Sequence, residues 1–143
     1  MTVEHNVKID VHQIVKRDAQ KEHFSHQTTG QWLKKETDWI RYQEQIENAT
    51  VNVTIKLADD SVKLIRKGDI NMNMHFIEGQ DTTTFYELPH GKMVLTVHTM
   101  SILHFVTPDG GKLKVHYALF QGDEKMGTYQ YEIKYKEKSD EHY

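Results

Sequence analysis

The sequence contains no cysteine, and this excludes several classes of protein at once. Without cysteine there is no disulfide-stapled scaffold, no zinc or iron–sulfur site built on thiolates, and no thiol nucleophile. Proline is scarce, with two residues, and the eight glycines fall at the breaks between patterned stretches. A chain of 143 residues buries enough surface to fold without a covalent or metal staple. We therefore expect one domain over residues 1–143.

The sequence also lacks an excess of one charge and any long apolar run. The 18 Lys and Arg against 21 Asp and Glu give a net charge of −3, whereas a nucleic-acid-binding surface is strongly basic. No apolar run approaches the roughly 20 residues needed to span a membrane. The first ten residues are polar and charged, unlike a signal peptide. We expect a soluble, cytoplasmic protein that binds neither nucleic acid nor membrane.

What the sequence does contain is alternation of apolar and polar residues, which is typical of β-strands with one buried face. Five stretches show it: 7–12, 51–57, 70–76, 112–119 and 129–135. Short turn sequences rich in Gly, Pro and Asp separate the apolar stretches. An antiparallel meander of about eight to ten strands has exposed edges unless it closes on itself. The sequence therefore predicts an all-β, up-and-down meander closed into a barrel, with a β-sandwich as the alternative.

The turn at 108–110 decides which side chains around it face inward. A three-residue loop there pairs Phe105 with Leu113, so that apolar residues of both strands share one face. The residues placed inside by this register are Ser101, Leu103 and Phe105. The apolar residues left on the outer face are Met100, Ile102 and Phe120. Apolar residues on the solvent-facing side of a sheet indicate that another surface packs on them, such as a partner in a homodimer.

A series of motifs along nearly the whole chain resembles the YwiB-like family of Gram-positive bacterial proteins. The residues that carry the resemblance are Thr29-Gly30, Trp39 to Glu44, Val62 to Gly68, Met74, Phe76, Gly79, Tyr86, Leu88 to Gly91, Met93, Thr99, Tyr117, Leu119 and Gly122. The resemblance implies a lipocalin-like (calycin) β-barrel. It implies no activity and supplies no catalytic residue, because the family is described as a domain of unknown function.

Two charged residues are predicted to point into the barrel. Arg66 lies in phase with Val62 and Leu64, and Glu44 lies in phase with Ile40. An arginine at a barrel mouth can hold a carboxylate or phosphate through two hydrogen bonds. The alternative is structural, with Arg66 stacked on a tryptophan or paired with Glu44.

A set of large apolar and aromatic residues is also predicted to project into the interior. Those that would line a ligand cavity are Met72, Met74, Phe76, Tyr117 and Tyr131. An eight-stranded barrel is just wide enough to be filled by side chains or to hold one small ligand. Methionine and tyrosine suit both a cavity wall and an irregular core.

Other constellations indicate no catalytic or metal site. The ten histidines are spaced so that we expect them on the surface and not around a metal. The sequence has no Gly-x-Ser-x-Gly motif and no glycine-rich phosphate-binding loop, so we expect no cofactor.

Three functions remain. The first is a non-enzymatic module that binds a small apolar or amphipathic ligand inside the barrel. The second is a homo-oligomeric or protein–protein interaction module with a filled core. The third and most remote is a small barrel enzyme of the isomerase or hydratase type, with Glu44 as its acid.

Overall fold

The computed structural model describes residues 3–34, 36–46 and 48–138, which form ten β-strands and no helix. The strands are β1 (Val3–Arg17), β2 (Gln20–Lys34), β3 (Asp38–Ile46), β4 (Ala49–Leu57), β5 (Val62–Gly68), β6 (Asn71–Phe76), β7 (Asp81–Leu88), β8 (Gly91–Thr107), β9 (Gly110–Gln121) and β10 (Glu124–Glu137). Each strand pairs with its neighbours in sequence, and β1 also pairs with β10 to close the barrel. The predicted fold class is confirmed. No helix able to cross a membrane is present in this part of the chain.

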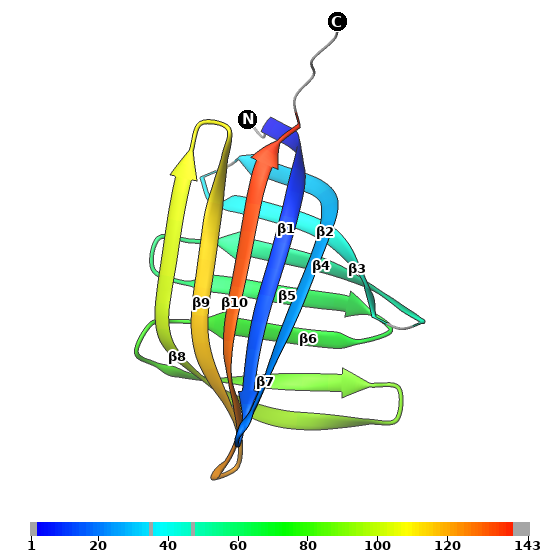
Figure 1. Cartoon of the computed structure of the whole chain (residues 1–143), viewed down its shortest axis with the longest axis vertical. Coiled ribbons are helices and arrows are strands. Elements are labelled where there is room, and N and C mark those ends of the chain that lie inside the picture. Colours follow the sequence, from blue (N-terminus) through cyan, green and yellow to red (C-terminus); the bar gives the residue numbers. More distant parts are fainter. Residues whose placement is uncertain (1–2, 35, 47, 139–143) are drawn as a thin grey trace, which may run out of the picture.

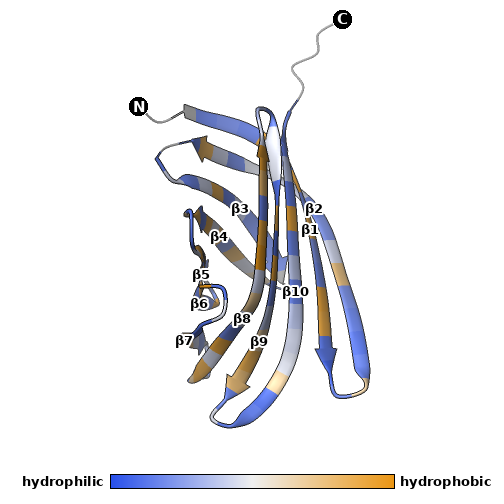
Figure 2. Ribbon diagram, turned by 90° about the vertical axis from the view of Figure 1, so that its left-hand side faces the viewer, coloured by the Kyte–Doolittle hydropathy of each residue, from blue (hydrophilic) through white to orange (hydrophobic). Residues whose placement is uncertain are grey.

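The barrel wall consists of two groups of strands that cross each other. In Figure 1, β1, β9 and β10 run along the long axis and β3 to β7 run across it, while β2 and β8 bend from one direction into the other. Figure 2 shows the two groups as facing layers with the interior between them. Because successive strands reverse direction, alternate turns lie at opposite ends of the barrel. We call the end with the β1–β2, β5–β6, β7–β8 and β9–β10 turns the hairpin end, and the other the termini end.

All five predicted alternating stretches are confirmed, and their apolar residues form the core. In β4, Val51, Val53 and Ile55 are almost fully buried, whereas the intervening Asn52 is exposed. The same alternation holds in β9 and β10, where Leu113 and Ile133 are directly opposite each other and fully buried. Each such side chain contributes roughly 1.5–3 kcal/mol by leaving water.

The predicted register of the β8–β9 hairpin is wrong. Its loop contains two residues, so Thr107 pairs with Gly110 and Phe105 pairs with Lys112 instead of Leu113. Leu103 and Phe105 consequently face solvent, with 51% and 60% of their surface exposed.

A β-bulge at Met100, where the register shifts between Thr99 and Ser101, reverses which residues of β8 face inward. One extra residue exchanges the two faces of a strand. Residues 95, 97 and 99 point inward on one side of the bulge, and Ile102 packs against the core on the other. The predictions that Ser101 points inward and Ile102 outward are therefore wrong as well, whereas Met100 is exposed as predicted. Residues 102–106 carry apolar side chains in both phases, so their pattern alone does not fix the face.

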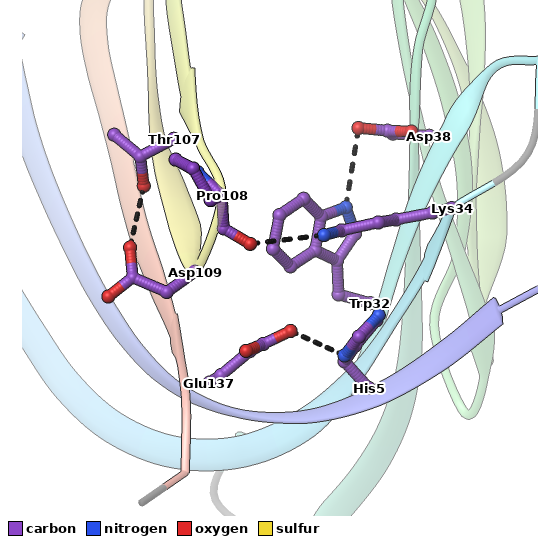
Figure 3. Close-up of polar contacts among 8 residues, drawn as sticks. All are labelled: His5, Trp32, Lys34, Asp38, Thr107, Pro108, Asp109 and Glu137. Carbon is purple, nitrogen blue, oxygen red and sulfur yellow. Dashed lines mark hydrogen bonds and ion pairs between the residues drawn. The ribbon is translucent and has the colours of Figure 1, made fainter.

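A group of polar contacts ties the termini end together (Figure 3). The buried Trp32 indole donates to Asp38 at 3.3 Å and packs edge-on against Tyr135. Lys34 lies over the same ring, 4.1 Å from its centre, and donates to the carbonyl oxygen of Pro108 in the β8–β9 turn. These contacts link β2 to the turn that faces it across this end of the barrel.

Gly30 allows β2 to lie between β1 and β3. It pairs with Val7 on one side and Tyr42 on the other. A Cβ added there would lie 2.1 Å from the backbone oxygen of Arg41, which is too close for any side chain. This position therefore requires glycine because of packing.

We predict that Gly30→Ala lowers the free energy of unfolding by about 1–3 kcal/mol, because the methyl group forces β2 and β3 apart. Gly91→Ala is the control, since an added Cβ at Gly91 meets nothing within 4 Å. It should change stability by less than about 0.5 kcal/mol. Urea denaturation measures both, and equal effects of the two substitutions would contradict the packing argument.

Candidate functional site

The barrel interior is filled toward the termini end and hollow toward the hairpin end. Trp32, Ile40 and Leu113 fill the first part and have no exposed surface. The hollow part is a cavity of about 330 Å³, which we call the inner cavity. Its wall comes from most strands and includes Gln13, Arg17, Glu44, Arg66, Ile70, Met72, Met74, Tyr86, Met93, Leu95, Tyr117, Leu119, Met126 and Tyr129. Its volume suits a small organic ligand.

A charged pair stands in the wall of this cavity. Glu44 of β3 and Arg66 of β5 both point inward, with 10% and 12% of their side-chain surface exposed. The Arg66 Nε atom lies 3.6 Å from a Glu44 carboxylate oxygen. Both inward orientations predicted from the sequence are confirmed, and so is the pairing of Arg66 with Glu44.

Two tyrosines extend this pair into a hydrogen-bonded chain. The Tyr42 hydroxyl donates to the other Glu44 oxygen at 2.9 Å. The Tyr42 and Tyr131 hydroxyl oxygens are 2.5 Å apart. Because Tyr42 uses its proton on the carboxylate, Tyr131 is the donor in this second bond. The order is therefore Tyr131 to Tyr42 to Glu44, with Arg66 beside the carboxylate.

Burial governs the protonation of these groups. It raises the pKa of Tyr131 to about 12, although the Arg66 charge opposes the rise. Burial raises the pKa of Tyr42 well above its usual range, and the neighbouring Tyr131 and Glu44 add to the shift. Burial of Arg66 works to lower its pKa, but the Glu44 carboxylate and the neighbouring tyrosines together outweigh burial, and the pKa of Arg66 is raised. At neutral pH the tyrosines are neutral hydrogen-bond donors and Arg66 is a cation.

The hydrogen bonding of Arg66 is incomplete within the described residues. Its Nε atom is buried and has no hydrogen-bond partner among them. The contact with Glu44 is an ion pair at 3.6 Å, which is too long to be a hydrogen bond. A buried guanidinium with an unsatisfied N–H is costly, so this site favours an added acceptor.

A second hollow lies beside the charged pair, along the boundary between β2 and β3. It has a volume of about 500 Å³, and we call it the lateral groove. Its wall consists of Val11, Gln13, His23, Phe24, Ser25, His26, Glu44, Arg66 and Tyr131. Gln13, Glu44 and Arg66 line both this groove and the inner cavity.

A larger depression of about 650 Å³ lies toward the termini end and is rich in carboxylates, including Glu36, Asp38 and Asp59, with His104 beside them. In the described part of the chain, no group of three or more His, Asp or Glu side chains is arranged to hold a metal ion. His104 instead contacts the Tyr135 hydroxyl, and burial lowers the pKa of this histidine. The inner cavity is therefore the stronger candidate site.

The seven residues singled out from the sequence all lie inside the barrel. Met72 and Met74 line the inner cavity together with Tyr117, and Tyr131 lines the lateral groove. Phe76 is buried deeper and packs against Tyr117, with 4.8 Å between ring centres.

Sequence reasoning missed several wall residues. Met93 and Met126 lie close to turns, where no long alternating stretch marks their phase, and Gln13 and Arg17 are polar residues late in β1. The alternation of β1 continues to Val15, so the phase of Val11 would have placed Gln13 and Arg17 inside.

The raised pKa of Tyr131 predicts a loss of stability at alkaline pH. Its folded-state pKa of about 12 exceeds the unfolded value of about 10, so above pH 10 the unfolded chain releases this proton first. Between pH 8 and 11 the wild type should lose about 1.4 kcal/mol more than Tyr131→Phe does. Urea denaturation at both pH values measures this, and equal losses would show that Tyr131 is not buried as described.

Comparison with known proteins places this fold and sequence in a family. The family described as "Domain of unknown function (DUF1934)" matches residues 9–133. The protein named "Uncharacterized beta-barrel protein YwiB" from Bacillus subtilis (strain 168) is 25% identical over 136 residues, which cover 94% of this chain and 96% of that protein. The crystal structure of the ywiB protein from Bacillus subtilis matches with a TM-score of 0.87 at 23% identity, covering 95% of this chain and 94% of that one. The family resemblance is confirmed, and the chain belongs to the DUF1934 family of β-barrel proteins.

Proposed function

We propose that the protein is a non-enzymatic, cytoplasmic binding module whose barrel holds a small apolar or amphipathic ligand. One observation carries this proposal. The inner cavity combines an apolar wall with a buried arginine whose Nε atom has no hydrogen-bond partner among the described residues. A cavity with a few converging polar groups is the usual form of a small-molecule site.

Methionines make the cavity wall adaptable. Met72, Met74, Met93 and Met126 account for four of the chain's six methionines. Their unbranched, polarizable side chains fit ligands of irregular shape. The wall therefore suits the apolar part of the ligand, while Arg66 and the tyrosines suit its polar part.

The Glu44 carboxylate supports binding more than catalysis. It accepts a hydrogen bond from Tyr42 and faces Arg66, so both oxygens already have partners. A general acid needs free access to the substrate, whereas both Glu44 oxygens face groups of the protein. Glu44 in this proposal is the counter-ion of Arg66.

The interaction module remains a second proposal, supported by exposed apolar side chains. Phe85 and Val94 are directly opposite each other on β7 and β8 and are 62% and 54% exposed. Leu103 and Phe105 add to the apolar surface of β8. A homodimer that covers these residues would use the outer face of the barrel and not its interior.

Native mass spectrometry of freshly purified protein, compared with the denatured mass, tests both proposals together. Ligand binding predicts an extra mass per chain that is lost on denaturation and returns when the extract is added back. A dimer at the bare polypeptide mass would favour the interaction module. A bare monomer that takes up no apolar compound would contradict both.

A substitution that fills the inner cavity should abolish uptake of an apolar probe. Met72→Trp places an indole in the cavity, so we expect affinity for a neutral phenylnaphthylamine dye to fall about tenfold or more. Met100→Trp is the matched control, because Met100 is exposed at the bulge of β8. Dye fluorescence measures both, with thermal unfolding as the check on folding. Equal affinity in the two variants would show that the dye binds elsewhere.

A further inference from the structure

The barrel wall is incomplete on one side of β2. The pairing of β2 with β3 extends from Gly30–Tyr42 to Leu33–Trp39, which is four residue pairs. The preceding ten residues, 20–29, pair with β1 along their whole length but have no β3 partner. Among the described strands this is the longest run paired on one side, and the lateral groove lies along it.

The groove exposes side chains that a complete wall would cover. Phe24 lies opposite Gln13 on the inward face of β2, yet 51% of its surface is exposed. In contrast, Val7 and Ile9, at the paired end of the same hairpin, are almost fully buried. The interior is therefore accessible from the side between β2 and β3, as well as through the hairpin end.

The two hollows meet at Arg66 and differ in character. Both share Gln13, Glu44 and Arg66. The groove adds His23, Ser25 and His26 beside Val11 and Phe24, whereas the inner cavity adds Met72, Met74, Met93 and Met126. An amphiphile that enters apolar end first from the groove places its chain among the methionines and leaves its head at Arg66. Entry through the hairpin end would instead leave the head near Arg17, which lies close to the β1–β2 turn.

We propose that the ligand is a mono-anionic amphiphile that enters through the lateral groove and is held there by its anionic group at Arg66. This inference rests on the proposed function and specifies its ligand class and route. The anionic group pairs with the guanidinium of Arg66, which lines both hollows, and offsets its desolvation. Head-first passage over the methionines would require the anion to lose its hydration without a partner.

The pairing pattern also allows the groove to widen. Residues 20–29 can move away from β3 without breaking a backbone hydrogen bond to it, since none joins them. The same displacement at Trp32 would break the β2–β3 ladder and the contact with Asp38. Widening of the groove and rigidity at the termini end are therefore compatible.

Closing the groove covalently tests the route. Gln27 lies in the part of β2 without a β3 partner and Gln45 lies in β3 beyond Tyr42, so Gln27→Cys/Gln45→Cys places one thiol on each side of the gap, and the chain has no other cysteine. The probe is anilinonaphthalene sulfonate, an aromatic mono-anion, and its association rate is measured by stopped-flow fluorescence. We expect the oxidised protein to associate about tenfold or more slowly, with recovery on reduction. A bis-maleimide linker closes the gap if oxidation does not.

The matched control keeps the same cysteine and moves its partner. Gln45→Cys/Thr50→Cys joins residues that are directly opposite on β3 and β4 and does not span the gap between β2 and β3, so it should leave the rate unchanged. A normal rate with the groove closed would overturn the route while leaving ligand binding intact. Failure of the unmodified protein to bind the sulfonate and the neutral dye would overturn the proposed function as well.

The position of the anionic group is tested by comparing two arginines. Arg66→Gln should weaken the sulfonate probe about tenfold or more and leave the neutral dye within about twofold. Lys63→Gln, an exposed cation on the same strand, should change neither. A larger loss of sulfonate binding in Arg17→Gln than in Arg66→Gln would place the head at the hairpin end and overturn the proposal.

Discussion

Closure of the barrel by β1 and β10 is the interaction on which the rest of the structure depends. Ten residue pairs, from Val7–Glu137 to Lys16–Thr128, join strands from the two ends of the described chain. Without this pairing the sheet would have two exposed edges and no interior. Bringing together segments so far apart in sequence has an entropic cost of loop closure, which precedes the formation of any contact between them. Burial of the apolar side chains of β1 and β10 offsets this entropic cost, because these side chains become buried only when the sheet is closed.

The interior divides into a part that stabilises the fold and a part that costs stability. Trp32, Tyr135 and their neighbours fill the termini end, where Asp38 and Lys34 satisfy or cover the indole. The hairpin end instead contains a charged pair and a cavity. Replacing a buried ion pair with well-packed apolar residues is often neutral or stabilising. The Glu44–Arg66 pair is therefore poorly explained by stability alone, and the proposed binding function would give it a physical reason.

Much of this fold could be predicted from the sequence because, in a closed sheet, the apolar residues of an alternating strand face the interior. Where a stretch such as 51–57 alternates cleanly, the inward face is determined, and Arg66 and Glu44 follow from the phase of their neighbours. The same dependence on neighbouring residues gave the wrong inward face for Ser101, Leu103 and Phe105. The alternation of inward and outward residues along a strand holds only as far as a bulge, and the bulge at Met100 has no distinctive sequence.

The site was harder to predict than the fold. Which side chains point inward is a property of each strand, but whether they meet or leave a space depends on all strands together. Phe76 and Met72 share one face of β6, yet Phe76 belongs to the filled part and Met72 to the cavity wall. Likewise, the sequence of β2 does not reveal that residues 20–29 lack a β3 partner, because this results from the divergence of β3 after Tyr42.

The boundary between the filled and hollow parts also separates stability from mobility. Local opening of a protein occurs most readily in regions that have few cross-strand hydrogen bonds and few buried contacts. Residues 20–29 of β2 fit this description, while residues 30–33 of the same strand are paired on both sides and include the fully buried Trp32. One strand is thus paired on both sides at one end and on one side at the other. Gly30 lies at the junction, where the lack of a side chain lets β2 lie close to the Arg41 backbone of β3. A barrel built in this way can admit a ligand from the side while its closure by β1 and β10 stays intact.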